Sequence, residues 1–112
     1  MKKITEFSHT PQDLVSLPPR PTRSNKGDFG RVLLVCGSRG MAGASYLAAL
    51  GAYRTGAGLV EIFAPEENRV ILQTLIPEAV LTLYNADSPD TDLLCERLER
   101  CDDVTVGCGL GR

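Results

Sequence analysis

Short apolar segments alternate with helical segments along most of this chain, and the alternation limits the folds open to it. The apolar segments, each expected to form a strand, are RVLLVC (31–36), LVEIFA (59–64), AVLTLY (79–84) and VTVG (104–107). Helices are expected between them, over 42–55, over 66–76 after Pro65, and over 92–101. Strands joined through helices form right-handed crossovers and a parallel sheet with helices on its faces. The sequence therefore predicts an α/β fold, with the continuous apolar segment 31–36 buried on both sides of the sheet.

The first 25 residues have a different character. Residues 8–25 hold four of the seven prolines, and Pro18, Pro19 and Pro21 favour an extended, polyproline-like path. Ile4 and Phe7 are expected to hold the beginning of this segment against a surface. Since 112 residues suit one compact domain, we expect an extended arm over 1–25 and one α/β domain over 26–112.

Composition removes several classes of protein. With 43% hydrophobic and 23% charged residues, the chain is typical of a folded globular protein. No apolar segment approaches the roughly 20 residues that span a bilayer, and the start MKKITEFSHT lacks the apolar core of a signal peptide. We therefore expect a cytoplasmic protein that neither crosses a membrane nor is secreted.

The charge balance argues against nucleic acid as a partner. Twelve basic and fourteen acidic residues give a net charge of −2, whereas nucleic-acid-binding domains are usually basic. Residues 1–39 hold seven basic and three acidic residues, a local charge of +4, and the remainder holds five and eleven, a local −6. A basic first third suits a small anionic ligand, and a solvated surface accounts for it as well.

The cysteines predict neither a zinc site nor disulfides. Cys36, Cys95, Cys101 and Cys108 show no C-x-x-C spacing, and His9 is the single histidine. Without a secretory signal, reduced thiols that pack as small apolar side chains are expected.

All eleven glycines fall in two zones, 27–58 and 107–111. The first zone contains Gly37-Ser-Arg-Gly40-Met-Ala-Gly43-Ala44, between a predicted strand and a predicted helix. Such a turn presents backbone N–H groups and the positive end of a helix, which bind phosphate, pyrophosphate or carboxylate. The spacing fits neither the phosphate-binding P-loop nor the G-x-G-x-x-G dinucleotide fingerprint. A tight structural turn that lets the alanine-rich helix pack closely therefore stays open as the alternative.

The second zone, 107–111, directly follows the last predicted strand. In doubly wound sheets, ligands lie outside the carboxyl ends of the strands. We therefore expect the two glycine loops to converge on one crevice, with Ala44 and Gly109 on the same side of the molecule.

Several motifs occur together in a fixed order: Lys26–Gly30 (KGDFG), Gly37–Ala44, Arg54–Leu59 (RTGAGL) and Pro77-Glu78. In this order and spacing, the chain from Leu17 to Arg112 resembles the amino-terminal part of the ADP/ATP-dependent NAD(P)H-hydrate dehydratases. These are the YjeF carboxyl-terminal-domain proteins of the ribokinase-like superfamily. The resemblance covers roughly the first 40% of a family domain, and it implies the amino-terminal portion of a three-layer, ribokinase-like α/β sandwich.

The resemblance also implies an activity. Family members repair nicotinamide coenzymes by dehydrating the S-form of hydrated NADH or NADPH, with ADP or ATP and a divalent metal, Mg²⁺. The nucleotide phosphorylates the added hydroxyl, and phosphate then leaves. The family usually assembles as a homotetramer.

Matched to the family, Ala44 corresponds to a substrate-contacting position, and the 107–111 loop corresponds to a Gly-Pro-Gly-Leu-Gly segment that lines the substrate. The expected substrate-binding residues are Ala44, Gly109, Gly43, Gly40, Gly107 and Gly111. Two positions depart from the family pattern: Cys108 stands where the family has proline, and Asn25 where it often has histidine.

The family's nucleotide-binding loops and its Gly-x-Gly-Asp segment, which carries the catalytic aspartate, belong to the later half of the domain. We therefore assign no catalytic residue, expect the nucleotide-binding residues to lie outside this sequence, and expect the 112-residue chain to be inactive on its own. Asp28, Asp102 and Asp103 are expected to be solvated loop or turn residues.

Two other functions remain open. The first is an inactive remnant or a dinucleotide-binding or oligomerisation module. The second is a fragment of a ribokinase-like small-molecule kinase, which the KGDFG motif disfavours. In each case part of the sheet is expected to expose apolar surface and to favour association.

Overall fold

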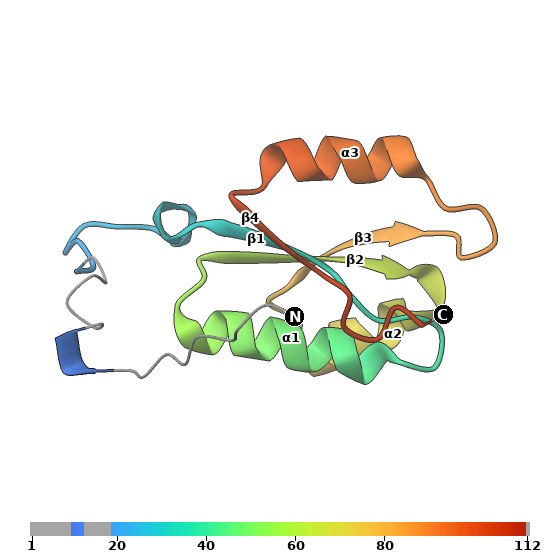
Figure 1. The fold of residues 1–112 in the computed structure, drawn as a ribbon, viewed down its shortest axis with the longest axis horizontal. Helices are drawn as coiled ribbons and strands as arrows, with labels where there is room; N and C mark the ends of the chain where they lie inside the picture. The colour runs from blue at the N-terminus through green and yellow to red at the C-terminus, as the bar shows by residue number, and fades with distance from the viewer. Residues whose placement is uncertain (1–9, 13–18, 112) are drawn as a thin grey trace, which may run out of the picture.

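A computed structural model of the chain describes residues 10–12 and 19–111, and strands and helices alternate along it (Figure 1). The strands are β1 (Arg31–Val35), β2 (Leu59–Pro65), β3 (Val80–Tyr84) and β4 (Asp103–Val106). The helices are α1 (Ala42–Thr55), α2 (Arg69–Leu75) and α3 (Thr91–Arg100), with 3₁₀ turns η2 (Lys26–Phe29) and η3 (Glu66–Asn68). The predicted order of elements is confirmed.

The predicted helix over 66–76 is wrong in its first turn. Residues Glu66–Asn68 form the 3₁₀ turn η3, and the α-helix begins only at Arg69. Asn68 is buried, and its side-chain amide donates a hydrogen bond to the carbonyl of Ser38 at 2.9 Å. A tighter 3₁₀ turn is a common way to begin a helix, and here it carries Asn68 toward the first glycine loop.

The four strands form one parallel sheet in the order β3-β2-β1-β4. Helices α1 and α2 cover one face, whereas α3 lies on the other (Figure 1). The change of face follows from the topology, because a right-handed crossover that reverses direction across the sheet places its helix on the opposite side. Strands β1 and β4, which are far apart in sequence, are therefore neighbours.

The core lies between the sheet and the pair α1 and α2. Its buried residues are Leu34, Cys36, Ala49, Val60, Ile62, Ala64, Leu72, Ile76 and Ala79. In the centre of β1, Leu33 and Leu34 are both buried, and since successive side chains of a strand point to opposite faces, β1 is buried on both faces there. Strand β4 is exposed along its whole length.

The end of the arm contacts the domain near the amino end of β1. Arg20 donates a hydrogen bond to the carbonyl of Gly56 at 3.1 Å, and its guanidinium carbon lies 4.2 Å from the centre of the Phe29 ring. Ile4, Phe7, His9 and Pro18 lie outside the described residues. In the part of the chain that the structure describes, no helix is both long and apolar enough to cross a bilayer.

Candidate functional site

The two glycine loops meet at the carboxyl edge of the sheet. Gly37 donates its backbone N–H to the carbonyl of Cys108 at 2.6 Å, and the Ser38 hydroxyl donates to the carbonyl of Gly109 at 2.8 Å. These bonds continue the pairing of β1 with β4, because Gly107 also donates to the carbonyl of Val35 at 3.2 Å. The expected meeting of the two loops is confirmed, whereas a shared ligand crevice stays a prediction.

Ala44 and Gly109 lie against one another. A Cβ atom built on Gly109 would come within 2.6 Å of the Ala44 Cβ, closer than side chains pack. Gly109 also has a φ of +70°, a left-handed conformation that favours glycine. The second loop therefore rests directly on the first turn of α1, and only glycine allows this approach.

Two buried polar side chains hold the first loop in place. The Ser45 hydroxyl donates to the carbonyl of Cys36 at 2.7 Å, and Asn68 donates to the carbonyl of Ser38. Both side chains are almost fully buried. Sequence reasoning missed these two residues; the available signals were a serine on the inner face of an alanine-rich helix and an asparagine directly before a helix.

The amino end of α1 has no side-chain cap. Met41 at the N-cap makes no side-chain capping bond, and the first turn carries no acidic residue. Unsatisfied N–H groups and the helix dipole favour negative charge at such a position. Gly40 and Gly43 are exposed here, and a Cβ on either would meet nothing within 4 Å.

The remaining glycines of the second loop differ from Gly109. A Cβ on Gly107 would meet nothing within 4 Å, and one on Gly111 would lie 3.8 Å from the Ser38 hydroxyl. Both residues are exposed. The edge therefore combines one tightly packed contact, between Gly109 and Ala44, with open backbone at Gly40, Gly43 and Gly107.

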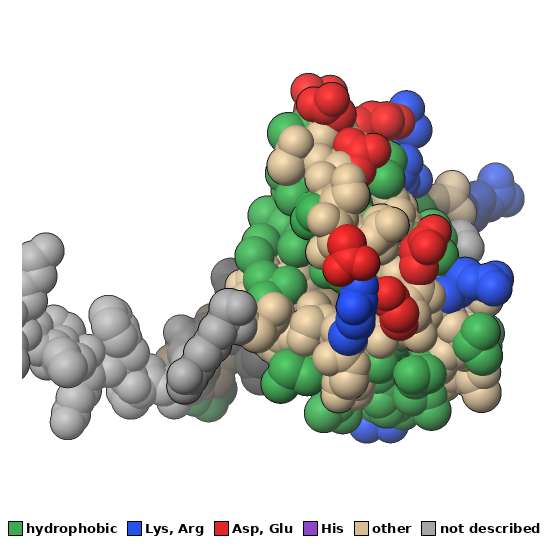
Figure 2. Space-filling model, turned by 90° about the vertical axis from the view of Figure 1, so that its right-hand side faces the viewer, with side chains coloured by type: hydrophobic (Ala, Val, Ile, Leu, Met, Phe, Trp, Pro, Cys, Tyr) green, Lys and Arg blue, Asp and Glu red, His purple; other side chains and the backbone are tan. Residues whose placement is uncertain are grey.

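The arginine of the first glycine loop is engaged in ion pairs. Arg39, in the first glycine loop, is paired with Glu67 at 2.9 Å and with Asp87 at 3.1 Å. Asp87 and then Glu67 raise the pKa of Arg39 above its ordinary value. Figure 2, which faces this side of the molecule, shows acidic side chains spread over it.

Two of the described basic residues of the first third lie away from this edge. Arg31 begins β1 and Arg20 contacts Phe29, so both lie at the opposite edge, with the amino ends of the strands. An anion held at the first glycine loop would therefore depend on backbone N–H groups more than on the paired Arg39 side chain.

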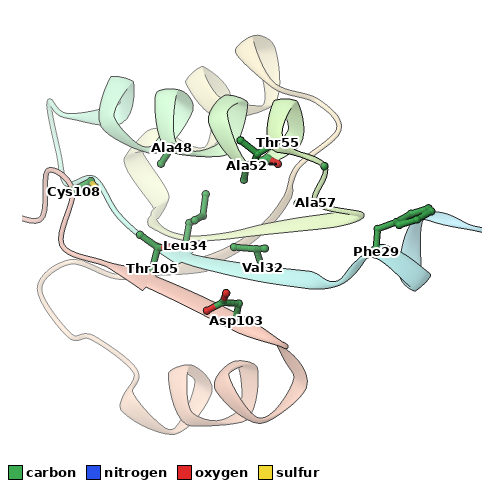
Figure 3. Close-up of a pocket in the computed structure, with 11 residues that line it drawn as sticks. Phe29, Val32, Leu34, Ala48, Ala52, Thr55, Ala57, Asp103, Thr105 and Cys108 are labelled. Carbon is green, nitrogen blue, oxygen red and sulfur yellow. Dashed lines mark hydrogen bonds between the residues drawn. The ribbon is translucent and has the colours of Figure 1, made fainter. Parts of the chain in front are cut away.

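A groove of about 610 Å³ runs along the sheet beside α1 (Figure 3). Val32, Leu34 and Thr105 form part of its floor, and Ala48 and Ala52 of α1 form a wall. From the two glycine loops, Cys108 alone contributes to the lining. The groove is largely apolar, so it does not offer the anion-binding chemistry of the neighbouring sheet edge.

The three aspartates set aside in the sequence lie away from the glycine loops. Asp28 accepts a hydrogen bond from the N–H of Asn25 at 2.8 Å, and Asp103 is the first residue of β4. Asp102 is exposed, as expected of a solvated turn residue, but it also has a structural role. Its carboxylate accepts a hydrogen bond from the N–H of Arg31 at 2.8 Å, and its own N–H donates to the Arg31 carbonyl. Asp102 therefore fastens the beginning of β4 to that of β1.

The described residues do not fit a divalent metal. Within residues 10–12 and 19–111, no group of three or more His, Cys, Asp or Glu side chains is arranged to hold a metal ion. We therefore assign no metal-dependent step to these residues.

Comparison with known proteins places the chain in a family. The NAD(P)H-hydrate dehydratase family matches residues 32–112. This range includes both glycine loops and, apart from the first residue of β1, all four strands. The chain belongs to this family. A relative of the same family from Listeria monocytogenes, named ADP-dependent (S)-NAD(P)H-hydrate dehydratase, is 37% identical over 112 residues, which cover 99% of this chain and 37% of the relative.

Other members of the NAD(P)H-hydrate dehydratase family are similar to the chain at comparable identity. A bifunctional NAD(P)H-hydrate repair enzyme of Vibrio cholerae is 40% identical over 86% of this chain and 19% of its own length. The chain thus spans about a third, or less, of the length of these curated relatives.

Solved structures of the family and its superfamily share the fold. A ribokinase-like superfamily protein of Enterococcus faecalis has a TM-score of 0.73 at 33% identity, over 84% of this chain and 32% of its own. The ADP/ATP-dependent NAD(P)H-hydrate dehydratase of Bacillus subtilis, co-crystallised with ATP and Mg²⁺, has a TM-score of 0.57 at 39% identity, over 62% of this chain and 25% of its own. The expected ribokinase-like α/β fold is confirmed.

Proposed function

We propose that this chain supplies the substrate-binding side of an ADP/ATP-dependent (S)-NAD(P)H-hydrate dehydratase. The observation that carries the proposal is the packing of Gly109 on Ala44 at the carboxyl edge of the sheet, within the segment that matches the family. Ligands of doubly wound sheets bind outside this edge. The Listeria monocytogenes relative is named for the same reaction.

In this proposal the backbone, and not a cluster of cations, holds the substrate. Hydrated NADH or NADPH carries a pyrophosphate, which suits the uncapped amino end of α1. Gly40, Gly43 and Gly107 leave open space, so a ligand can approach their backbone closely. Gly109 and Gly111 shape the second side of the site, with Gly109 fixed against Ala44.

The chemical step is not assigned to the described residues. Dehydration requires a nucleotide and Mg²⁺ in the family, and the described residues hold no metal-binding cluster. We propose that the 112-residue chain binds the substrate without turning it over, and that it works in the cytoplasm as part of a homo-oligomer. Steady-state turnover of hydrated NADPH with ATP and Mg²⁺ by the purified chain would contradict this proposal.

A matched pair of helical glycines tests the binding site. Gly43 and Gly51 both lie in α1, are exposed, and have open space where a Cβ would be added. Gly43 is in the first turn, beside the proposed ligand, whereas Gly51 lies two turns further along. Alanine is favoured over glycine in a helix by about 1 kcal/mol, so both Gly43→Ala and Gly51→Ala should fold at least as well as the parent chain.

Binding of (S)-NADPH-hydrate is then measured by titration calorimetry. We expect Gly43→Ala to weaken binding about tenfold or more, because the added methyl group occupies ligand space, and Gly51→Ala to leave it unchanged. Equal affinities of the two variants, or no binding by the parent chain, would contradict the proposed site. Equal affinity for NADPH and its hydrate would favour a general dinucleotide-binding module.

A further inference from the structure

Two of the four cysteines lie together where the glycine loops join. Cys36 follows the last residue of β1 and is fully buried, whereas Cys108 is an exposed residue of the second loop. The hydrogen bond of 2.6 Å from the Gly37 N–H to the Cys108 carbonyl links the peptide groups directly beside them. The two backbone segments that carry the cysteines are therefore direct neighbours, as a disulfide between them requires.

The side chains of the pair share the same side of the sheet. Cys36 belongs to the core beneath α1, and Cys108 lines the groove that runs beside the same helix (Figure 3). The Cys36 sulfur lies 3.8 Å from the carbonyl of Thr105, which also lines this groove. Burial is the largest cause that raises the pKa of Cys36, and the neighbouring Cys108 thiol adds to it.

We propose that Cys36 and Cys108 are a reversible disulfide site that joins the carboxyl end of β1 to the Gly107–Gly111 loop. Both thiols are free in the structure, so the oxidised form is a second state of the protein. This proposal does not depend on the identity of the ligand at the sheet edge.

A low-molecular-weight disulfide of the glutathione type is the oxidant. The exposed Cys108 attacks it as the thiolate, forms a mixed disulfide and releases one thiol. The Cys36 thiolate then attacks the Cys108 sulfur, forms the internal disulfide and releases the second thiol. Two electrons and two protons pass from the cysteines to the oxidant, which leaves as two thiols.

The other two cysteines provide the control. Cys95 and Cys101 lie at α3 or its end, on the opposite face of the sheet. The five helical residues between them span more than one turn and place them too far apart for a disulfide. A Cys95→Ser/Cys101→Ser variant therefore retains only the proposed pair.

The test is oxidation of the full 112-residue chain with glutathione disulfide, followed by alkylation and intact-mass measurement. In the Cys95→Ser/Cys101→Ser variant, we expect both remaining thiols to be lost within a monomer, with no glutathione attached, and to return on reduction. Adding Cys108→Ser should stop the reaction. Stable glutathione adducts, unreacted thiols or disulfide-linked dimers as the main product would overturn the proposal.

A measurement on the parent chain guards against a poorly folded variant. Trypsin releases Cys36 in peptide 32–39 and Cys95 in peptide 70–97, and it leaves both Cys101 and Cys108 in peptide 101–112. We expect oxidation to join peptide 32–39 to peptide 101–112 and to shift the urea midpoint of the chain upward. A main cross-link that includes peptide 70–97 would overturn the proposal. Fragmentation of the cross-linked peptide between Cys101 and Cys108 shows which of the two is joined to Cys36, and a link through Cys101 would also overturn the proposal.

Discussion

Strand β1 has a parallel neighbour on each side, and the two neighbours differ in burial. On one side, β2 is buried at six of its seven positions, with α1 and α2 packed on one face and Arg97 of α3 reaching the other. On the other side, β4 is exposed at all four positions. Both strands pair with β1 through regular parallel registers.

The difference shows that regular hydrogen bonding to β1 does not by itself bury a strand. Val104 and Val106 are as apolar as the residues of β2, yet they are 39% and 61% exposed. Helix α3 lies against β1, and its Arg97 side chain reaches Glu61 of β2. Strand β4 therefore has its hydrogen-bond ladder with β1 but little of the packing that stabilises β2.

The largest expected effect comes from removing packing on the β2 side. Ile62 is fully buried, so Ile62→Ala should lower the free energy of unfolding by about 4 kcal/mol, within the range for large-to-small changes in a core. Val106→Ala, on the exposed neighbour, should cost less than about 1 kcal/mol. Urea unfolding followed by circular dichroism measures both, and equal losses would remove the distinction between the two sides.

The second effect concerns the attachment of α3. The Arg97 guanidinium donates two hydrogen bonds to Glu61, at 2.6 and 2.9 Å, and Thr82 donates a third. Arg97→Met leaves the carboxylate of Glu61, whose side chain is 4% exposed, without its cation. We expect a loss of about 2 kcal/mol at pH 7, below the 3–5 kcal/mol of fully buried pairs because Arg97 is partly exposed.

The matched control on the same helix is Arg100→Met. Arg100 and Glu96 form an exposed ion pair at 3.2 Å, and such pairs contribute less than about 1 kcal/mol. A loss from Arg100→Met as large as that from Arg97→Met would contradict a specific role for the buried pair.

The pH dependence of unfolding tests the same pair. Burial acts to raise the pKa of Glu61, but the hydrogen bonds of Arg97 and Thr82, with the charges of Arg97 and Arg31, outweigh it, so the pKa lies below its ordinary value. The resulting stabilisation is complete above the unfolded-state pKa of about 4.3 and is lost as the pH falls through the lower folded-state pKa. The difference in urea midpoint between the parent chain and Arg97→Met should therefore shrink below about pH 4.

The sequence predicted the elements well because their signals are local. The apolar segments and the helix over 42–55 are bounded by glycine and proline, and the structure places them within a residue or two. The contact between Ala44 and Gly109 was also predictable, since the carboxyl ends of neighbouring parallel strands share one edge. In each case nearby residues or the general topology were sufficient.

What the sequence did not predict depends on partners far along the chain. Glu61 is the single charged residue of an apolar segment, and nothing near it in the sequence indicates its partner, because Arg97 is 36 residues away. Asn68 resembled an ordinary helix residue, although it is buried against Ser38. The acidic surroundings of Arg39, from Glu67 and Asp87, likewise arise only when the loops are brought together.

The third effect separates a tight glycine from an open one on the β4 side. Gly109 and Gly107 both have positive φ, at +70° and +126°, so alanine is strained at either position. Only Gly109→Ala also drives a methyl group against Ala44. We expect it to cost about 1–2 kcal/mol more than Gly107→Ala, because overpacking adds to the backbone strain. Equal urea midpoints for the two variants would show that the second loop moves away from α1 at no cost.

The smallest effect on stability concerns the exposed surface of β4 itself. Val106→Lys changes a side chain that already faces solvent, so the free energy of unfolding should stay within about 0.5 kcal/mol of the parent value. Charged residues on an edge strand oppose pairing with other chains, so self-association in sedimentation velocity should decrease. Leu47→Lys is the matched change on α1, where Leu47 is 65% exposed. If Leu47→Lys reduces association and Val106→Lys does not, then the helical face mediates association, and the exposed strand β4 is stable in water without a partner.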